Sequence, residues 1–447
     1  MKSNKTKIAI VLFLATLQGF SQEILTKKQA LAITLENNFG IKIANNNFEV
    51  ARNNAGIYNS GYLPTAALNS GGDYRNNNQK IIFTDPQTGN DAERVGTGAV
   101  TKSYNVSLGL NYTLFDGLGR KYNYQQLKET YNLTALQVKE TIENTYLQLF
   151  TVYFQIARLS ENTLNLEEAL TISQRRYKRA EYQYEYGQST KLEVLNAEVD
   201  INNDSILVIN ARQQLSNAKR GLNVILGIEK DVNYQVETAV NFNKLMNFEA
   251  LQEKTTANNT TLKQNQKNIA ISEFNIKINK ANYLPSLNFI TSYGFNRTEN
   301  ENLVNPFGAR LITSDGLNAG LNLSWNIFDG GATKTRVANA KIALENQQIL
   351  FEQQKVTIRN SVKNTWENYK NQLFVLKSQE KNIQTTQNNF DRTQEKYRLG
   401  QVTSIEFRQA QINLINSKTA ANNAKFDAKL IELLLLQLSG DILNFKF

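Results

Sequence analysis

The chain repeats itself, and this internal duplication constrains its fold more than any other feature. Short marks in the first half recur in the second half at a spacing of 213 residues, and one further mark recurs at 221. Because one spacing holds over such a long stretch, the 447 residues form two similar halves rather than about three unrelated domains. The recurring marks are Phe115-Asp116-Gly117 with Phe328-Asp329-Gly330, Gly187-Gln188 with Gly400-Gln401, Gly227 with Gly440, and Tyr62-Leu63-Pro64 with Tyr283-Leu284-Pro285.

Each half shows the same order of patterns: a helix, two strands of alternating polarity around a polar loop, and two long helices. We therefore expect a mainly α fold with a small β part, built as a duplicated helix-strand-strand-helix repeat. The first helix is expected at 27–60 and the first polar loop at 76–101. The predicted first repeat is 22–227, with strands at about 64–75 and 103–115 and a helical hairpin at about 119–226. The predicted second repeat is 248–440, with strands at about 285–297 and 316–328 and a helical hairpin at about 333–438. Residues 228–247 are expected to form a connector and residues 441–447 a tail.

The first residues have the pattern of an export signal. Three lysines precede an apolar run from Ile8 to Leu17, which is too short to cross a bilayer as a helix. A cleavage site follows plausibly after Ser21. We expect residues 1–21 to be a signal peptide, and the short apolar run disfavours the alternative of a retained membrane anchor.

The composition excludes several kinds of chemistry. The chain has no cysteine and no histidine, which excludes disulfides, thiol nucleophiles, Ser-His-Asp triads and zinc sites built on those ligands. Its formal charge of +10 is spread along the chain without a dense basic block, so nucleic-acid binding is not favoured. We expect no cofactor, no resident metal ion and no enzyme activity, because no segment offers the concave site that a carboxylate enzyme such as a glycosidase needs.

The strands raise the question of how their edges are covered. In the last strand Leu321 and Leu323 alternate with Asn322 and Ser324, which gives one apolar and one polar face. Four strands cannot close a membrane barrel, and an open sheet edge cannot lie in hydrocarbon. If these strands lie in a membrane, the barrel is therefore shared between chains. The alternative is a soluble sheet packed on the helices.

The long helices carry a heptad pattern. The second half has no proline or glycine from about 333 to 398, which corresponds to a helix of roughly 100 Å. A strict seven-residue repeat predicts left-handed supercoiling against neighbouring helices, whereas an ordinary bundle would need a wider apolar face. The apolar positions are Val362, Tyr369, Leu376, Ile383, Phe390 and Tyr397.

Together, these marks and their paired order resemble those of the TolC-like outer-membrane efflux proteins. The resemblance covers nearly the whole chain after the signal peptide. It implies a homotrimer whose strands form one 12-stranded β-barrel in outer-membrane lipid, continued by a long periplasmic α-helical barrel. It also implies the location, the outer membrane of a Gram-negative bacterium. The implied function is passive conduction, as the exit duct of a tripartite efflux system with a periplasmic adaptor (membrane fusion) protein and an inner-membrane transporter.

The resemblance also implies where function is concentrated. Glu406 matches the first of two family gate carboxylates, Gln409 stands at the second, and Tyr397 matches a family latch tyrosine; Glu193 and Asn196 are their first-repeat equivalents. The alternative is that both glutamates have no gate role and are solvated first-turn residues favoured by the helix dipole. The implied adaptor-docking turns, which could also serve only to reverse the helices, are Gly187, Gln188, Ser189 and Thr190, and Gly400, Gln401, Val402 and Thr403.

Other functions remain open. A duct for protein secretion has the same architecture, because the inner-membrane partner largely selects the substrate. A trimeric coiled-coil adhesin or structural protein shares the heptads and the export signal but does not need duplicated strands. Specialised metal-ion efflux is weakly disfavoured, because soft ligands are almost absent.

Overall fold

The computed structural model describes residues 24–229, 234–243, 246–303 and 308–445, so the predicted signal peptide lies outside it. The chain divides into two compact units, each of which takes residues from both halves of the sequence. The sheet unit comprises residues 49–133 and 266–349. The helical unit comprises the described parts of 1–48, 134–265 and 350–447. The protein is mainly helical with a smaller strand part, as the sequence predicted.

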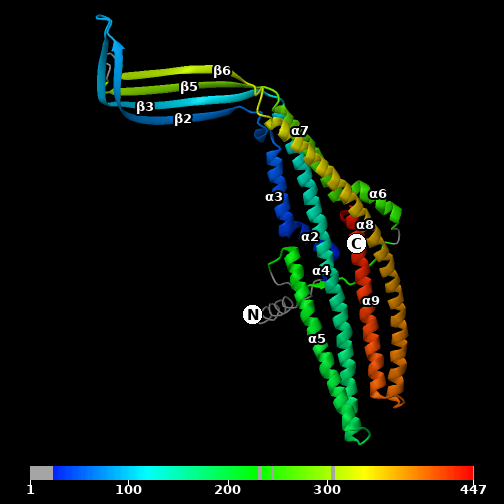
Figure 1. Cartoon of the computed structure of the whole chain (residues 1–447). Helices are drawn as coiled ribbons and strands as arrows, with labels where there is room; N and C mark the ends of the chain where they lie inside the picture. The colour runs from blue at the N-terminus through cyan, green and yellow to red at the C-terminus, as the bar shows by residue number, and fades with distance from the viewer. Residues whose placement is uncertain (1–23, 230–233, 244–245, 304–307, 446–447) are drawn as a thin grey trace, which may run out of the picture. The chain divides into compact units, whose positions relative to one another are not determined.

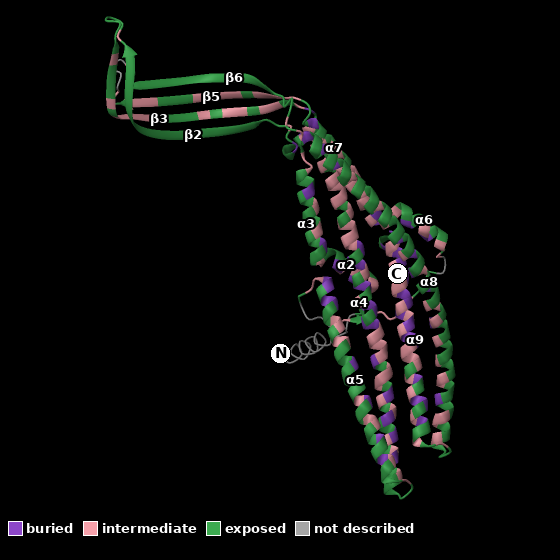
Figure 2. Cartoon of the chain, in the orientation of Figure 1, coloured by how far each residue is buried: buried purple, intermediate pink, exposed green. Residues whose placement is uncertain are grey.

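The sheet has four antiparallel strands in the order β2-β3-β5-β6 among the described residues (Figure 1). The two hairpins meet at the central pair, β3 with β5, so the duplicated halves are joined edge to edge. The outer strands β2 and β6 are exposed along their whole length (Figure 2). The bounds are β2 (Thr65–Thr84), β3 (Asp91–Asp116), β5 (Ser286–Glu301) and β6 (Leu311–Ser324).

The two faces of the sheet differ in polarity. Cross-strand neighbours such as Leu68, Leu108, Tyr293 and Leu317 lie in one row on one face. The opposite face is amide- and hydroxyl-rich, with Asn69 beside Ser107 as one example. The apolar face carries Leu68, Val106, Leu108, Leu110, Leu287, Phe289, Tyr293, Leu317, Leu321 and Leu323.

The first hairpin is longer than the sequence pattern predicted. The expected loop 76–101 is mostly strand, because pairing continues to Thr84 opposite Asp91. The chain reverses just beyond, where the Asp85 carboxylate accepts from Gln87 N at 2.9 Å and Gly89 has a φ of 70°. Such an Asx turn with a following glycine is a tight reversal, so a long loop is not needed.

The last strand begins and ends earlier than the sequence pattern predicted. The prediction placed it at 316–328, whereas β6 begins at Leu311 and ends at Ser324. Its partner β5 begins at Ser286 after Pro285, and Ser286 opposite Ser324 is the final pair. Proline has no amide to donate to a ladder, so pairing stops there.

Four helices form two hairpins. They are α4 (Gly119–Glu185) with α5 (Lys191–Leu226), and α8 (Ala332–Arg398) with α9 (Ser404–Leu438). Both α4 and α8 have 67 residues, or roughly 100 Å each. The heptad residues Val362, Tyr369, Leu376 and Phe390 are buried in α8. Among the described residues no helix has the length and apolar composition needed to cross a membrane.

The helices that precede the strands are each broken in two. Instead of one helix at 27–60, the chain forms α2 (Lys27–Asn37), α3 (Phe39–Asn54) and the short η1 (Ile57–Asn59). The second repeat has the same break between α6 (Phe248–Asn258) and α7 (Thr260–Ala281). The broken helices belong to both units, since α3 and α7 each cross from one unit to the other.

An asparagine explains each break. Asn38 accepts from Ile41 N at 3.2 Å and donates to Ile225 O at 2.8 Å. Asn259 accepts from Leu262 N at 3.0 Å and donates to Leu438 O at 3.0 Å. At each break, one asparagine side chain caps the start of a helix and also donates to a backbone carbonyl at the end of another helix. These hydrogen bonds favour two short helices over one continuous helix.

The glycines after α5 and α9 fit closely against these breaks. Gly227 and Gly440 have φ values of 68° and 72°. A Cβ would lie 2.4 Å from Asn37 O at the first position and 2.5 Å from Asn258 O at the second. These marks therefore recur because both the conformation and the close approach require glycine.

Gly440→Ala is expected to destabilise the protein by at least about 1–2 kcal/mol, the cost of a left-handed conformation, because the clash with Asn258 adds to it. Chemical denaturation of the two proteins measures the difference. Gly221→Ala is the matched control: Gly221 lies within α5 with open space around its Cβ position, so alanine should stabilise by about 0.5–1 kcal/mol. Equal effects of the two substitutions would contradict this account.

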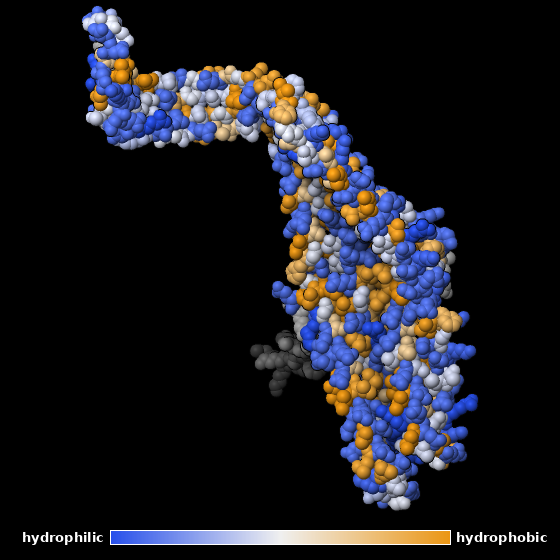
Figure 3. Space-filling view, viewed as in Figure 1, coloured by the Kyte–Doolittle hydropathy of each residue, from blue (hydrophilic) through white to orange (hydrophobic). Residues whose placement is uncertain are grey.

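The core of the helical unit is aromatic. Tyr146, Phe150, Tyr153 and Phe154 of α4 pack with Phe426 of α9 and are almost fully buried. The face shown in Figure 3 carries hydrophobic residues in patches between hydrophilic ones. Apolar residues are therefore also found on the surface, outside this core.

The described part of the predicted connector contains a short strand. Its β4 (Gln235–Val236) pairs with β1 (Ile24–Leu25) in parallel. The buried Tyr153 hydroxyl donates to Leu25 O at 2.6 Å and accepts from Glu237 N at 3.0 Å. Burial raises the pKa of Tyr153. This hydroxyl thus fastens both short strands to α4.

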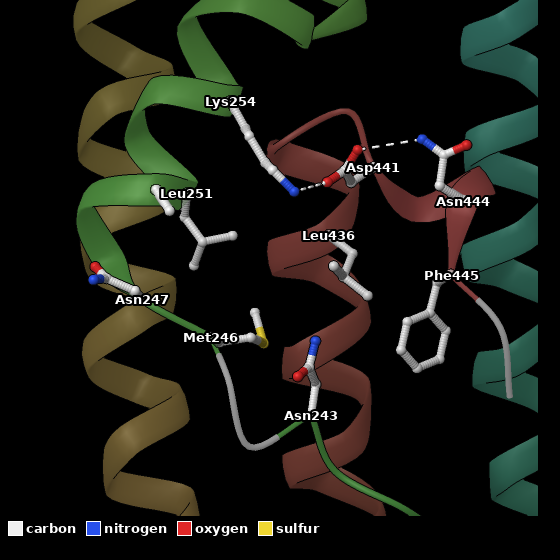
Figure 4. A pocket seen from close by; sticks show the side chains of 10 residues that line it. Asn243, Met246, Asn247, Leu251, Lys254, Leu436, Asp441, Asn444 and Phe445 are labelled. Carbon is white, nitrogen blue, oxygen red and sulfur yellow. Dashed lines mark hydrogen bonds and ion pairs between the residues drawn. The ribbon is translucent and has the colours of Figure 1, made fainter.

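The described part of the predicted tail, residues 441–445, is also packed. Its η2 (Ile442–Asn444) follows α9, and Ile442 is fully buried. Asp441 forms an ion pair with Lys254 of α6 at 2.5 Å and accepts from Asn444 at 3.3 Å (Figure 4). The hydrogen bond from the Lys254 side chain is the main reason that the pKa of Asp441 lies below its ordinary value.

Candidate functional site

The two hairpin turns share one backbone geometry. Gly187 and Gly400 have φ values of 70° and 73°. In the first turn Gln188 N donates to Gln183 O at 2.6 Å, and in the second Gln401 N donates to Lys396 O at 2.8 Å. These six-to-one bonds close a Schellman motif, in which a left-handed glycine ends a helix.

The turns differ in how the next helix begins. Thr403 is the N-cap of α9 and forms a capping box with Glu406. The Glu406 carboxylate accepts from Thr403 N at 2.7 Å and from Thr403 Oγ1 at 2.9 Å, while Thr403 Oγ1 accepts from Glu406 N at 3.2 Å. These hydrogen bonds from Thr403 hold the pKa of the exposed Glu406 below its ordinary value of 4.5.

The remaining gate candidates lie on two different hairpins. Glu193 is in the first turn of α5, where the Thr190 side chain makes no capping hydrogen bond, and Asn196 is exposed one turn further on. Gln409 is exposed on α9 and donates to Asn413 at 2.9 Å. Within one chain, Glu406 therefore has a built-in capping role that Glu193 does not share.

Tyr397 lies where the two hairpins meet. Its ring stacks on Phe407 with centroids 4.9 Å apart and an angle of 4°. The Arg179 guanidinium of α4 lies 4.9 Å over the same ring and donates to Arg398 O at 3.1 Å. The predicted latch tyrosine thus makes a ring contact within its own hairpin and a cation contact with the other hairpin.

A buried polar network that the sequence reasoning missed joins the same hairpins. Arg408 of α9 donates to both carboxylate oxygens of Asp204 of α5, at 2.8 and 2.7 Å. Ser173 of α4 donates to Asp204 at 2.6 Å, and Asp200 pairs with the buried Arg176. Burial opposes the charge of Arg408, but its bonds to Asp204 outweigh this and raise its pKa. The only sequence signal was that Asp200 and Asp204 are four residues apart and share a helix face.

The strand-to-helix turns lie in the sheet unit. Asp116 accepts from Arg120 N and Asp329 accepts from Thr333 N, both at 2.8 Å, so each aspartate caps the long helix that follows. The glycine after each aspartate has a positive φ, as a strand-to-helix reversal requires. These marks therefore fix where each long helix begins after its strand, within the sheet unit.

Comparison with known proteins establishes the family. A family model described as "Outer membrane efflux protein" matches residues 30–228 and 251–441, which is most of the chain. The chain belongs to the outer membrane efflux protein family. The two matched segments correspond to the two repeats, and the resemblance noted in the sequence is confirmed.

Individual relatives of this outer membrane efflux protein are distant. It is 21% identical over 310 residues to the outer membrane protein TolC of Vibrio cholerae, covering 68% of this chain and 70% of that one. It is 20% identical over 276 residues to the alkaline protease secretion protein AprF of Pseudomonas aeruginosa, covering 61% and 56%. The solved Campylobacter jejuni CmeC outer membrane channel superposes with a TM-score of 0.73 at 18% identity, covering 93% and 86%.

These likenesses agree on fold, location and transport role. The protein has the fold of the outer membrane channel structures and is an outer-membrane efflux protein. These relatives are named as outer membrane, secretion or channel proteins rather than enzymes.

Proposed function

We propose that three copies of this chain form one duct through the outer membrane, with a shared 12-stranded β-barrel. The duct conducts substrates passively, and it receives them from a periplasmic adaptor protein and an inner-membrane transporter. The turns from Gly187 to Thr190 and from Gly400 to Thr403 are the docking positions for the adaptor.

The four-stranded sheet supports this proposal most directly. The sheet has an apolar face, and the outer edges of β2 and β6 have no strand partner among the described residues. Its apolar rows run on β5 from Leu287 to Phe295, close to the 9–11 residues that a tilted strand needs to cross hydrocarbon. Because an open edge cannot lie in lipid, the edges must meet strands from other copies.

Electrical conductance tests the duct. The purified full chain, added to a planar bilayer, should give discrete current steps. A correctly folded oligomer that inserts into the bilayer but conducts no current would contradict conduction as its function. A coiled-coil adhesin predicts the absence of such steps.

We expect Glu406→Gln to weaken the block of this current by divalent or trivalent cations added from the periplasmic side. Three carboxylates around a narrow entrance attract cations, and the neutral Gln409 leaves one from this segment per chain. Because the hydrogen bonds from Thr403 hold the pKa of Glu406 below its ordinary value, the block should persist at mildly acidic pH and weaken only as stronger acid protonates the carboxylates. Current measured against cation concentration and pH checks both expectations.

Two features make this substitution a clean test. Glutamine also serves at this position of a capping box, so α9 keeps its first turn. Glu193→Gln is the matched control, because it removes a first-turn carboxylate from the other hairpin and should change the block less. Unchanged block in Glu406→Gln would leave that residue with only its capping role.

The likeness to AprF supports protein secretion as a second candidate function. The two candidates share the duct and differ in the inner-membrane partner. Crosslinking in intact cells, followed by identification of the captured inner-membrane protein, distinguishes an efflux pump from a protein exporter.

A further inference from the structure

The segment at the end of each repeat's second strand has a strand neighbour in the first repeat but none in the second among the described residues. This difference identifies a docking surface for a second copy of the chain. In the first repeat this segment runs from Tyr112 to Asp116, and in the second from Trp325 to Asp329, at the spacing of 213.

In the first repeat the segment is strand only because the other repeat pairs with it. The neighbour β2 covers β3 only as far as Asn111, opposite Thr65. Beyond Asn111 the pairing comes from β5, with Tyr112 opposite Phe289 and Asp116 opposite Ser286. The strand continues because an edge from the next repeat lies beside it.

In the second repeat that neighbour is missing within one chain. Pairing of β6 with β5 ends at Ser324, the position equivalent to Asn111. The next residues leave the strand, and Phe328 is 86% exposed, compared with 37% for its equivalent Phe115. The segment 325–329 therefore has a strand sequence without a strand partner among the described residues.

The glycine that follows shows the same contrast. A Cβ at Gly117 would lie 3.0 Å from Leu284 Cβ, in the second Tyr-Leu-Pro mark. At Gly330, no heavy atom of the described residues lies within 4 Å of that position, apart from the glycine and its two chain neighbours. The equivalent of Leu284 is Leu63, which is 46% exposed. The Ala281 carbonyl oxygen would lie 2.4 Å from the same Cβ at Gly117, and the equivalent of Ala281 is Ser60, which is buried in its own chain and not available.

We propose that residues 325–329 pair with the start of β2 in a second copy and that Leu63 of that copy packs against Gly330. This inference rests on the proposed trimer and adds the register of its joints. Transfer of the β3–β5 pairs places Trp325 opposite the second copy's Leu68, Asn326 opposite its Ala67 and Asp329 opposite its Thr65.

The transferred register also places each side chain on the matching face of the sheet. A slip of one residue would put every side chain of a strand on the wrong face. In the transferred register Leu321 and Leu323 lie opposite Gly72 and Ser70, in line with Leu68, so the apolar face of β6 continues into the apolar face of β2. The polar faces also coincide, with Ser324 opposite Asn69.

Paired cysteines test the register in the full chain, which has no cysteine of its own. Asn326→Cys with Ala67→Cys should give a covalent trimer on mild oxidation in the membrane. The two positions belong to opposite edges of the sheet, roughly 14 Å apart within one copy at about 4.8 Å per strand, so the disulfide must join different copies. The matched control, Asn326→Cys with Asp73→Cys, is displaced by roughly 20 Å along the strand and should stay uncrosslinked.

The outcomes separate this inference from the proposed function. Native mass of the unoxidised protein first establishes whether it is a trimer. A trimer that crosslinks only through the designed pair supports the register. A trimer in which the designed pair stays reduced, or in which the control pair crosslinks, overturns the register and leaves the duct intact. A monomer overturns both.

Discussion

Leu321→Arg is expected to prevent most of the protein from inserting into the outer membrane. Leu321 lies on the apolar face of β6, opposite Phe289 and one row from the middle of the apolar rows, with 65% of its surface exposed. An arginine facing lipid near the midplane costs about 2–4 kcal/mol per copy, and the proposed trimer carries three copies. Fractionation of membranes, with trimers detected on unheated gels, measures the loss.

Asn322→Arg is the matched control for the face assignment. Asn322 is the adjacent residue on the polar face, in the row of Asn288. Its arginine would face the water-filled interior, so insertion should remain normal while the conductance changes. Equal insertion of both variants would show that the faces are assigned wrongly.

Asp204→Asn is expected to destabilise the helical unit by about 3–5 kcal/mol, the cost of leaving a buried charge without its partner. Asp204 is 3% exposed and holds the Arg408 guanidinium through two hydrogen bonds. Asp200 lies 3.4 Å from Arg408 and should compensate only in part. Chemical denaturation of the assembled protein measures the difference.

A double substitution separates an unpaired charge from a general loss of packing. Asp204→Leu with Arg408→Leu removes both charges and should recover much of the stability, since replacing a buried pair by apolar residues is often neutral. A change below about 0.5 kcal/mol in Asp204→Asn would place it in the range of ordinary surface substitutions and contradict the network's role.

The fold class was predictable because its signals are local and duplicated. Glycine, proline and alternating polarity mark the strands and turns, and each mark appears twice. The helix breaks could also have been found, because Asn37-Asn38 recurs as Asn258-Asn259 at the same spacing of 221 as the Tyr-Leu-Pro mark. A lone asparagine within a helical pattern is a weak signal, but its recurrence is a strong one.

The strand ends were not predictable from alternation alone. The pattern through Trp325 and Ile327 is a strand pattern, yet β6 stops at Ser324 because a strand also needs a neighbour. Conversely, the polar residues of 76–101 form strand because their two arms pair with each other. Side-chain periodicity reports which face is buried, and backbone pairing decides where a strand ends.

The candidate site was predictable only in its local part. Gly187 and Gly400 identify the turns, and Thr403 with Glu406 is recognisable as a capping box. The Arg408–Asp204 pair joins residues 204 positions apart, and nothing in either neighbourhood identifies the other. Long-range polar pairs of this kind depend on how the hairpins pack.

The most direct test of the shared barrel is the native mass of the full chain, extracted in mild detergent from the outer membrane. The four strands of the described residues leave two free edges, which require strands from further copies. We expect one species at three times the mass of the processed chain. A one-copy species that keeps its β-sheet signal in circular dichroism would contradict it.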